Sequence, residues 1–250
     1  MEQTKSFVAM IKGENEILKK FEELKKFDTP LITNVVATYP TDKDTCLGLY
    51  HPWEGRWYSD QTLKCMFPEL GRCAGHVVTC VYGMPDPLFD RLGFGDILRA
   101  IDKTPKPVIL AVKQNLPEHI KKICGLVGGN MMTALKSVGV VGLLSDGPSR
   151  DIDEIRPMNM QYMLTGVTPG HGYLQIQAVN VPVEICGMDV ALGDIVHMDE
   201  NGATKFPAAY LDEVLVRARR LQIIEQKRQK MMRETTDVEG LAKIMQGLYD

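Results

Sequence analysis

Residues 128–151, GGNMMTALKSVGVVGLLSDGPSRD, decide the fold. A glycine-led loop runs into a stretch that favours a helix and stops at Gly139, and the apolar run VVGLLS follows at 140–145. A second apolar run, PVILAV at 107–112, comes before the loop. Both runs are short and contain β-branched residues, which favours buried strands. Strand, glycine-rich loop, helix and strand in this order predict a βαβ unit with two parallel strands.

The residues before this unit alternate between apolar and polar segments. Residues 14–27 predict an amphipathic helix, and PLITNVVATY at 30–39 predicts a strand. Residues 40–62 are polar and aromatic and predict an irregular loop, long enough to cover a site or an interface. GHVVTCVYG at 75–83 predicts another strand, and residues 86–104 a helix interrupted by two glycines.

The second half of the chain is rich in short strands. Residues 161–207 hold several of them, separated by turn-forming residues, and DENG at 199–202 predicts a hairpin. Pro207 is well placed to open a long helix, and a short helix follows at about 237–248. We therefore predict a single α/β domain over residues 1–250, with a helical tail over about 207–250.

Composition excludes several classes of protein. A net charge of -3 without a basic cluster argues against a nucleic-acid partner. The sequence has no run of about 18 apolar residues, so no membrane span is predicted. The first residues do not resemble a secretory signal. The six cysteines form no CxxC pair and match no zinc spacing, so we expect reduced, mostly buried thiols in a cytoplasmic protein.

The first candidate site is GLVGGN at 125–130, directly before the predicted helix. Free backbone N–H groups at the start of a helix attract anions, and glycines let a ligand approach the backbone closely. The stretch is not a G-x-G-x-x-G fingerprint and has no P-loop lysine. Taken alone, the stretch is better explained by a tight turn that requires flexible backbone.

The second candidate site is SRDIDE at 149–154. Asp151 and Glu154 are spaced as in a capping box, which would make them no more than a helix start. Alternatively, Asp151 binds a hard divalent cation and Arg150 presents its planar guanidinium to a substrate carboxylate. Gly129 lies 21 residues before Arg150. In a parallel βαβ unit both loops leave the same carboxyl edge of the sheet, so we expect them to face one crevice.

The segment GGNMMTALKSVGVVGLLSDGPSRDIDEI resembles the RraA-like family, which includes RNase E activity regulator A and class II pyruvate aldolases. These aldolases act on 4-hydroxy-4-methyl-2-oxoglutarate and 4-carboxy-4-hydroxy-2-oxoadipate. Gly129, Arg150, Asp151 and Glu154 match the family pattern G-x20-R-D-x2-E/D. VTPGHGY at 167–173 and the residues after it also resemble the family. The resemblance covers roughly residues 28–234.

The resemblance implies a three-layer β/β/α swivelling-domain core with a parallel βαβ unit, a β-rich second half and a C-terminal helical tail. It also implies a homotrimer or homohexamer with active sites at subunit interfaces. Asp151 would hold Mg²⁺ or Mn²⁺, with Glu154 among the metal residues, and Glu225 on a neighbouring subunit's helix would support the metal's waters. Arg150 would bind the carboxylate of the substrate.

The glycine loop completes the implied site. Its residues Gly128, Gly129, Asn130 and Met131 would hold the substrate through backbone amides. Aldolases of the family carry an aspartate at the position of Gly129, which orients the water for proton transfer. Loss of a positioned acid or base costs about 10²- to 10⁴-fold in rate.

A replacement for that aspartate must come from elsewhere in the chain. His171 could supply the proton, although a histidine on a glycine-rich loop can simply be exposed. His51 and Asp60 in the polar loop are weaker candidates.

These expectations favour a divalent-metal-dependent lyase acting on a small 2-keto acid or related carboxylate. The reaction would pass through an enolate, by retro-aldol cleavage or decarboxylation. The alternative is a non-catalytic oligomeric regulator that binds a protein partner, as the RNase E regulator does. Retention of Asp151 beside Arg150 favours the enzyme.

Overall fold

The computed structural model describes residues 2–39, 44–88 and 92–248. Within these ranges one mixed sheet has the strand order β1-β5-β4-β3-β2-β9-β10, with β6 also paired to β2. Its centre is parallel: β2 pairs with β3, β3 with β4, and β4 with β5. These four strands are β2 (Cys73–Gly83), β3 (Val108–Asn115), β4 (Val140–Ser145) and β5 (Gln161–Leu164).

The flanking strands are antiparallel to this centre. They are β1 (Lys64–Cys65), β6 (Gln175–Val179), β9 (Asp194–Asp199) and β10 (Gly202–Pro207). Asp199 pairs with Gly202 at the β9–β10 turn, which confirms the hairpin expected at DENG. Parallel pairing of β3 with β4 around the helix α5 (Gly129–Ser137) likewise confirms the βαβ unit.

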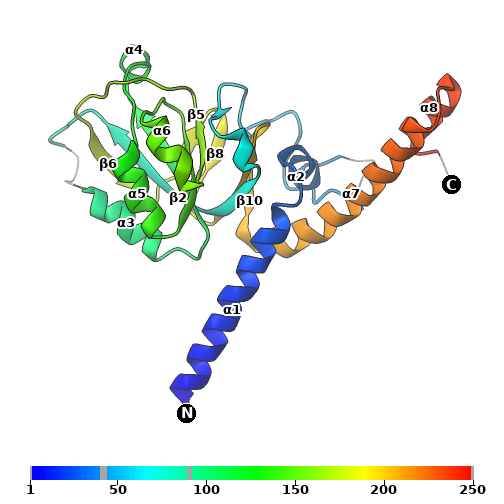
Figure 1. Ribbon diagram of the computed structural model, residues 1–250, viewed down its shortest axis with the longest axis horizontal. Helices are drawn as coiled ribbons and strands as arrows, with labels where there is room; N and C mark the ends of the chain where they lie inside the picture. The colour runs from blue at the N-terminus through cyan, green and yellow to red at the C-terminus, as the bar shows by residue number, and fades with distance from the viewer. Residues whose placement is uncertain (1, 40–43, 89–91, 249–250) are drawn as a thin grey trace.

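The sheet is covered differently on its two faces. Three helices cover one face, where they lie in front of β2 in Figure 1: α3 (Phe94–Asp102), α5 and α6 (Ile152–Ile155). The hairpin of β7 (Val183–Ile185) and β8 (Met188–Val190) packs on the opposite face. This arrangement is the expected β/β/α order of layers. The remaining short helices are η1 (Pro68–Leu70), α4 (Glu118–Lys121), η2 (Arg156–Met158) and η3 (Ala208–Tyr210).

The predicted strand at 30–39 is wrong, because these residues form the helix α2 (Thr29–Val36). The carboxylate of Asp28 caps it by accepting a hydrogen bond from the Leu31 amide at 2.8 Å, and Pro30 sits in the first turn. Leu31, Ile32, Val35 and Val36 are buried, at the three- and four-residue spacing of a helix. The β-branched composition pointed to a strand, but this spacing and the cap decide the outcome.

Helices dominate the two ends of the chain. α1 (Glu2–Leu24) begins earlier than the predicted helix, and α7 (Leu211–Arg233) and α8 (Val238–Met245) form the expected tail. α1, α2 and α7 share a second core at the β9–β10 end of the sheet. Figure 1 shows α1 and the outer part of α7 extending away from the sheet in different directions.

Two further predictions concern loops and thiols. Helix α3 is shorter than the predicted helix at 86–104, of which residues 89–91 lie outside the described ranges. The segment 44–62 is irregular as expected, and its Trp57 is buried in the second core. All six cysteines are free thiols and five are buried. None of the helices in the described ranges has the length and apolar character needed to cross a membrane.

Candidate functional site

A cleft of about 1170 Å³ lies at the carboxyl edge of the four parallel strands. A segment after each of these strands contributes to its lining: residues 85–87 and 92–94 after β2, 125–128 after β3, Arg150 after β4 and 171–174 after β5. This is the edge at which parallel α/β sheets bind ligands, because the loops of neighbouring strands converge there. The structure therefore brings the glycine loop and Arg150 to one crevice, as expected, whereas Asp151 and Glu154 are not among the described residues that line it.

The Arg150–Asp151 pair lies directly against the start of α5. The backbone N–H of Gly129 donates a hydrogen bond to Oδ2 of Asp151 at 3.0 Å. Nε of Arg150 lies 3.5 Å from the same oxygen. The rest of the Arg150 guanidinium has no hydrogen-bond partner among the described residues, and its side chain is 35% exposed. It is therefore available to bind an anion from the cleft.

Asp151 does not act as a helix cap. It precedes α6 with a left-handed backbone, φ 60°, and its side chain makes no hydrogen bond to the amides of that helix. The Glu154 amide instead donates to the backbone carbonyl of Asp151 at 3.1 Å. The capping box is thus absent, and the Asp151 carboxylate faces the glycine loop.

Two carboxylates cover two consecutive glycines. A Cβ atom at Gly128 would lie 2.1 Å from Oδ2 of Asp151, and one at Gly129 would lie 1.9 Å from Oε2 of Glu154. Any side chain at either position would displace the carboxylate above it. The double glycine is therefore needed for the close approach of the two acids to α5.

The start of α5 also leaves backbone donors unused. The Gly129 amide is taken by Asp151, whereas the amides of Asn130 and Met131 have no hydrogen-bond partner among the described residues. Unpaired donors in the first turn, together with the helix dipole, attract negative charge. Gly128 and Met131 line the cleft, so this helix start borders the cavity.

His171 lies on the rim of the cleft. It is exposed, and its Nδ1 lies 2.9 Å from the carbonyl oxygen of Gly172. The Gly125 amide donates to the Gly170 carbonyl at 2.8 Å, which joins this loop to the glycine loop. His171 therefore faces the same cavity as Arg150 and Gly128.

Three other candidates lie elsewhere in the chain. Glu225 is on α7, which packs against α1 and α2, and burial together with nearby Asp28 raises the pKa of Glu225. His51 is exposed, and Asp60 accepts a hydrogen bond from the Thr62 amide at 2.7 Å; neither lines the cleft. Within one chain these three residues do not join Asp151.

The donors available to a metal ion are few. The described residues contain no group of three or more His, Cys, Asp or Glu side chains placed to hold an ion. Asp151 is 31% exposed, with one oxygen engaged by Gly129, and the Glu154 carboxylate lies beside the next glycine. Such a donor set fits a hard cation that keeps most of its waters, as Mg²⁺ does.

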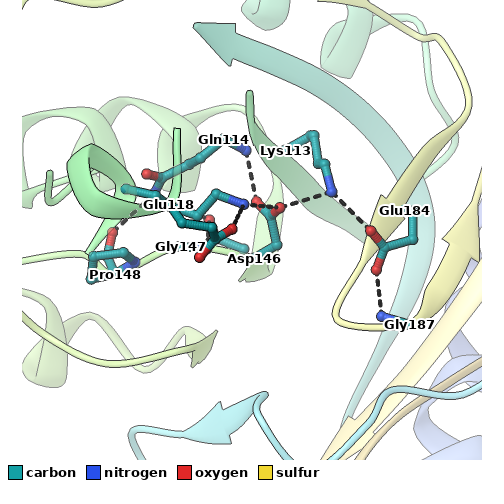
Figure 2. A network of polar contacts seen from close by, with 10 residues as sticks. Lys113, Gln114, Glu118, Asp146, Gly147, Pro148, Glu184 and Gly187 are labelled. Carbon is teal, nitrogen blue, oxygen red and sulfur yellow. Dashed lines mark hydrogen bonds and ion pairs between the residues drawn. The ribbon is translucent and has the colours of Figure 1, made fainter. Parts of the chain in front are cut away.

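A buried ionic network anchors the loop that carries Arg150 and Asp151, and sequence analysis missed it. Figure 2 shows Asp146 at its centre. Its carboxylate accepts hydrogen bonds from the backbone N–H of Gln114 at 2.7 Å and from the ammonium groups of Lys113 and Lys121 at 2.9 and 3.0 Å. Lys113 also binds Glu184 at 2.9 Å. Burial lowers the pKa of Lys113, but its two acidic partners outweigh this effect and raise it overall.

A second anchor joins the two loops beneath the site. The Ser149 hydroxyl donates to the carbonyl oxygen of Val127 at 2.9 Å, and the hydroxyl of Tyr162 contacts both groups. Val127 has a left-handed backbone, φ 67°. Such a conformation in a β-branched residue is costly, so the two hydroxyls help to hold the glycine loop in place.

The fold and the cleft define an α/β protein in which a glycine loop and an Arg-Asp pair meet at the edge of a parallel sheet. The RraA-like family, described as Aldolase/RraA, matches residues 49–204. The chain belongs to this family, which confirms the resemblance seen in its sequence.

Individual relatives match over shorter stretches. The chain is 28% identical over 138 residues to Protein DlpA of Legionella pneumophila, covering 54% of this chain and 22% of DlpA. It is 26% identical over 106 residues to a Halalkalibacterium halodurans protein named "Putative 4-hydroxy-4-methyl-2-oxoglutarate aldolase", covering 42% of this chain and 50% of that protein. The matches thus span half or less of these relatives' lengths.

Among solved structures, the chain resembles Streptomyces coelicolor RraAS2, described as an unusual member of the RNase ES inhibitor RraA protein family. The TM-score is 0.63 and the identity 20%, covering 84% of this chain and 96% of that one. This likeness establishes the fold.

Proposed function

We propose that the protein is a divalent-metal-dependent lyase that breaks a carbon–carbon bond of a small 2-keto acid or related carboxylate through an enolate, by retro-aldol cleavage or decarboxylation. The observation that carries the proposal is the convergence of Arg150 and the first turn of α5 at one cleft, with the Asp151 carboxylate held against both. A cation, a metal-binding carboxylate and unpaired amides are the groups that recognise a carboxylate and stabilise negative charge beside it. A relative named as an aldolase supports the same reaction class.

Each residue has a distinct part in this proposal. Arg150 binds the substrate carboxylate, and the amides of Asn130 and Met131 donate to the same carboxylate. Asp151, with Glu154 beside it, holds Mg²⁺ or Mn²⁺, and the hydrogen bond from Gly129 fixes the orientation of its carboxylate. When bound, the cation supplies Lewis-acid stabilisation for charge that develops on the keto oxygen.

Retro-aldol cleavage of a 4-hydroxy-2-keto acid requires two proton movements. The C4 hydroxyl loses its proton as the C3–C4 bond breaks, and the bonding pair forms an enolate between C2 and C3. A proton added to C3 then gives pyruvate and a carbonyl compound. His171 lies on the rim of the cleft and carries an imidazole, so it is the group to take the proton from the C4 hydroxyl and to return one to C3.

The complete site extends to a second subunit in this proposal. Glu225 lies on α7, away from the cleft of its own chain. In a homotrimer or homohexamer, Glu225 of a neighbouring copy supports the waters of the metal at Asp151. Closed symmetric assemblies repeat such a contact at every interface.

Calorimetry with Mg²⁺ and oxalate tests the proposal, because oxalate mimics the pyruvate enolate. We expect oxalate to bind only when Mg²⁺ is present, and the Asp151→Ala variant to lose this binding. Asp153→Ala is the matched control, since Asp153 is an exposed acid two residues away that has no partner among the described residues. Absence of metal-dependent oxalate binding in the unaltered protein would reject the lyase and favour a regulator of a protein partner.

A further inference from the structure

The cleft is much larger than a three-carbon acid requires. Its volume of about 1170 Å³ lies slightly above the range of ordinary ligand pockets, which hold molecules of drug size. Arg150 and the start of α5 provide one polar corner for a 2-keto carboxylate. The remaining space must accommodate the rest of the substrate.

Apolar side chains line much of this remaining space: Leu92, Phe94, Leu126, Met131, Leu174 and Ile176. Leu126 and Ile176 are buried in the core between the sheet and the helices α3, α5 and α6, and the other four side chains pack against this core. The wall is therefore the outer edge of the core beneath α3 and α5. Because close-packed cores hold their shape, this apolar wall is formed before any ligand arrives.

The charges along the cleft are unfavourable for a second carboxylate. Among the described lining residues, Arg150 is the one side chain with a permanent positive charge, and it lies at the polar corner. Asp86 also lines the cleft, and its carboxylate is held in a turn by the Leu88 amide at 2.8 Å. A dianionic substrate would place its second carboxylate against an apolar wall and near a like charge, which disfavours its binding.

Tyr82 adds a polar group to this wall. Alternation along β2 places its side chain with Val78 and Cys80 on the helix-covered face, and only 6% of Tyr82 is exposed. Its hydroxyl has no hydrogen-bond partner among the described residues and is not sealed from solvent. A buried tyrosine normally pairs its hydroxyl, so this one is free to pair with a ligand. Burial also raises the pKa of Tyr82, which keeps its hydroxyl protonated as a donor.

We infer that the substrate is a monocarboxylic 4-hydroxy-2-keto acid with an apolar tail, which packs on this wall while the Tyr82 hydroxyl donates to the oxygen at C4. The inference rests on the proposed lyase function and narrows its substrate class. Cleavage of such an acid at C3–C4 releases pyruvate and an apolar aldehyde or ketone. A 2-oxoglutarate derivative, with a second carboxylate, is disfavoured.

Ligand binding to the full chain in the presence of Mg²⁺ separates the inference from the proposed function. The probes are oxalate for the polar corner, pyruvate as a ligand without a tail, phenylpyruvate with an apolar tail and 2-oxoglutarate with an acidic tail. We expect phenylpyruvate to bind about tenfold more tightly than pyruvate, since burial of a phenyl ring is worth at least one decade of affinity. 2-Oxoglutarate should bind no more tightly than pyruvate.

The outcomes differ for the two ideas. Loss of all oxalate binding would reject the lyase itself. Normal oxalate binding with equal affinities for pyruvate and phenylpyruvate, or a preference for 2-oxoglutarate, would overturn the apolar tail and leave the lyase standing. Leu92→Ala should lower the affinity for phenylpyruvate more than that for oxalate.

Tyr82→Phe tests the contact at C4. This variant keeps the ring and removes the hydroxyl. It should raise the KM for a 4-hydroxy-4-phenyl-2-keto acid about tenfold, with a smaller effect on phenylpyruvate, which lacks that oxygen. Equal effects on both ligands would assign Tyr82 a purely structural role.

Discussion

The backbone N–H of Gly129 donates to Oδ2 of Asp151 across 3.0 Å, although 22 residues separate the two. This hydrogen bond joins the first turn of α5 to the loop that follows the strand β4. It also directs the Asp151 carboxylate away from α6, which it would otherwise cap. The proposed metal ligand Asp151, which lies after the second strand of the βαβ unit, is therefore oriented by the helix of that unit.

Alanine at the two glycines should separate the roles of the acids that cover them. In Gly128→Ala the new Cβ would lie 2.1 Å from Oδ2 of Asp151, whereas in Gly129→Ala it would meet Glu154. We expect Gly128→Ala to weaken Mg²⁺-dependent oxalate binding at least about tenfold, because the metal ligand must move. Gly129→Ala should weaken this binding less, because Glu154 only supports Asp151 in this proposal and the end of its longer side chain can move aside. Calorimetry on both variants checks the pair, and equal losses would show that neither carboxylate has a separate role.

Removal of the charge at Asp146 should destabilise the protein. The Asp146 side chain is 6% exposed and pairs with Lys113 and Lys121, so Asp146→Asn removes the buried counter-charge that the two ammonium groups share. Lys113 then keeps only the half-exposed Glu184 and Lys121 only the exposed Glu118 as acidic partners among the described residues. Since the lysines are themselves partly exposed, we expect a loss of about 2 kcal/mol in the free energy of unfolding. Glu118→Gln is the control, because Glu118 is 76% exposed and lies 3.5 Å from the same Lys121. It should cost less than about 0.5 kcal/mol in urea unfolding.

A comparison of Asp151 with Asp146 shows how much of the site the sequence alone could predict. The glycine loop and the Arg-Asp pair could be placed together, because parallel topology sends both loops to one edge of the sheet. Asp146 lies beside that pair in sequence, yet its partners are up to 33 residues away. Nothing local distinguishes Lys113 and Lys121 from the many solvated lysines of the chain. Only the packed structure reveals which charges are buried together.

A pH dependence of stability should come from His197. Burial lowers the pKa of His197 to about 4, and its Nδ1 lies 2.9 Å from the Thr29 hydroxyl. In the unfolded chain a histidine titrates near 6.5. Between these two values the unfolded state binds a proton that the folded state does not, so stability falls as the pH decreases from about 6.5 to 4. Below that window both states are protonated and this contribution stays constant.

Urea unfolding at several pH values measures this effect. The titration of His197 should lower the free energy of unfolding by at most about 3 kcal/mol across this pH window. The His197→Gln protein should be less stable at neutral pH. Its free energy of unfolding should depend less on pH across this window, because the contribution of His197 is gone. His51→Gln is the control, since His51 is exposed and its ring accepts a hydrogen bond from the backbone N–H of Trp53 at 3.4 Å. An unchanged slope in His197→Gln would contradict the assignment.

Subunit mixing should reveal whether Glu225 acts across an interface. Asp151 lies against the glycine loop beside Arg150, whereas Glu225 lies on α7 near Asp28 in the same chain. If each site combines Asp151 of one copy with Glu225 of the next, Asp151→Ala and Glu225→Gln homomers should both be impaired. Oligomers assembled from equal amounts of the two variants should regain about a quarter of the intact sites, because one neighbouring pair in four carries both residues unaltered. The number of oxalate molecules bound tightly per chain in the presence of Mg²⁺ measures that fraction. A mixture that binds no better than the average of the two separate variants would confine Glu225 to a role within its own chain.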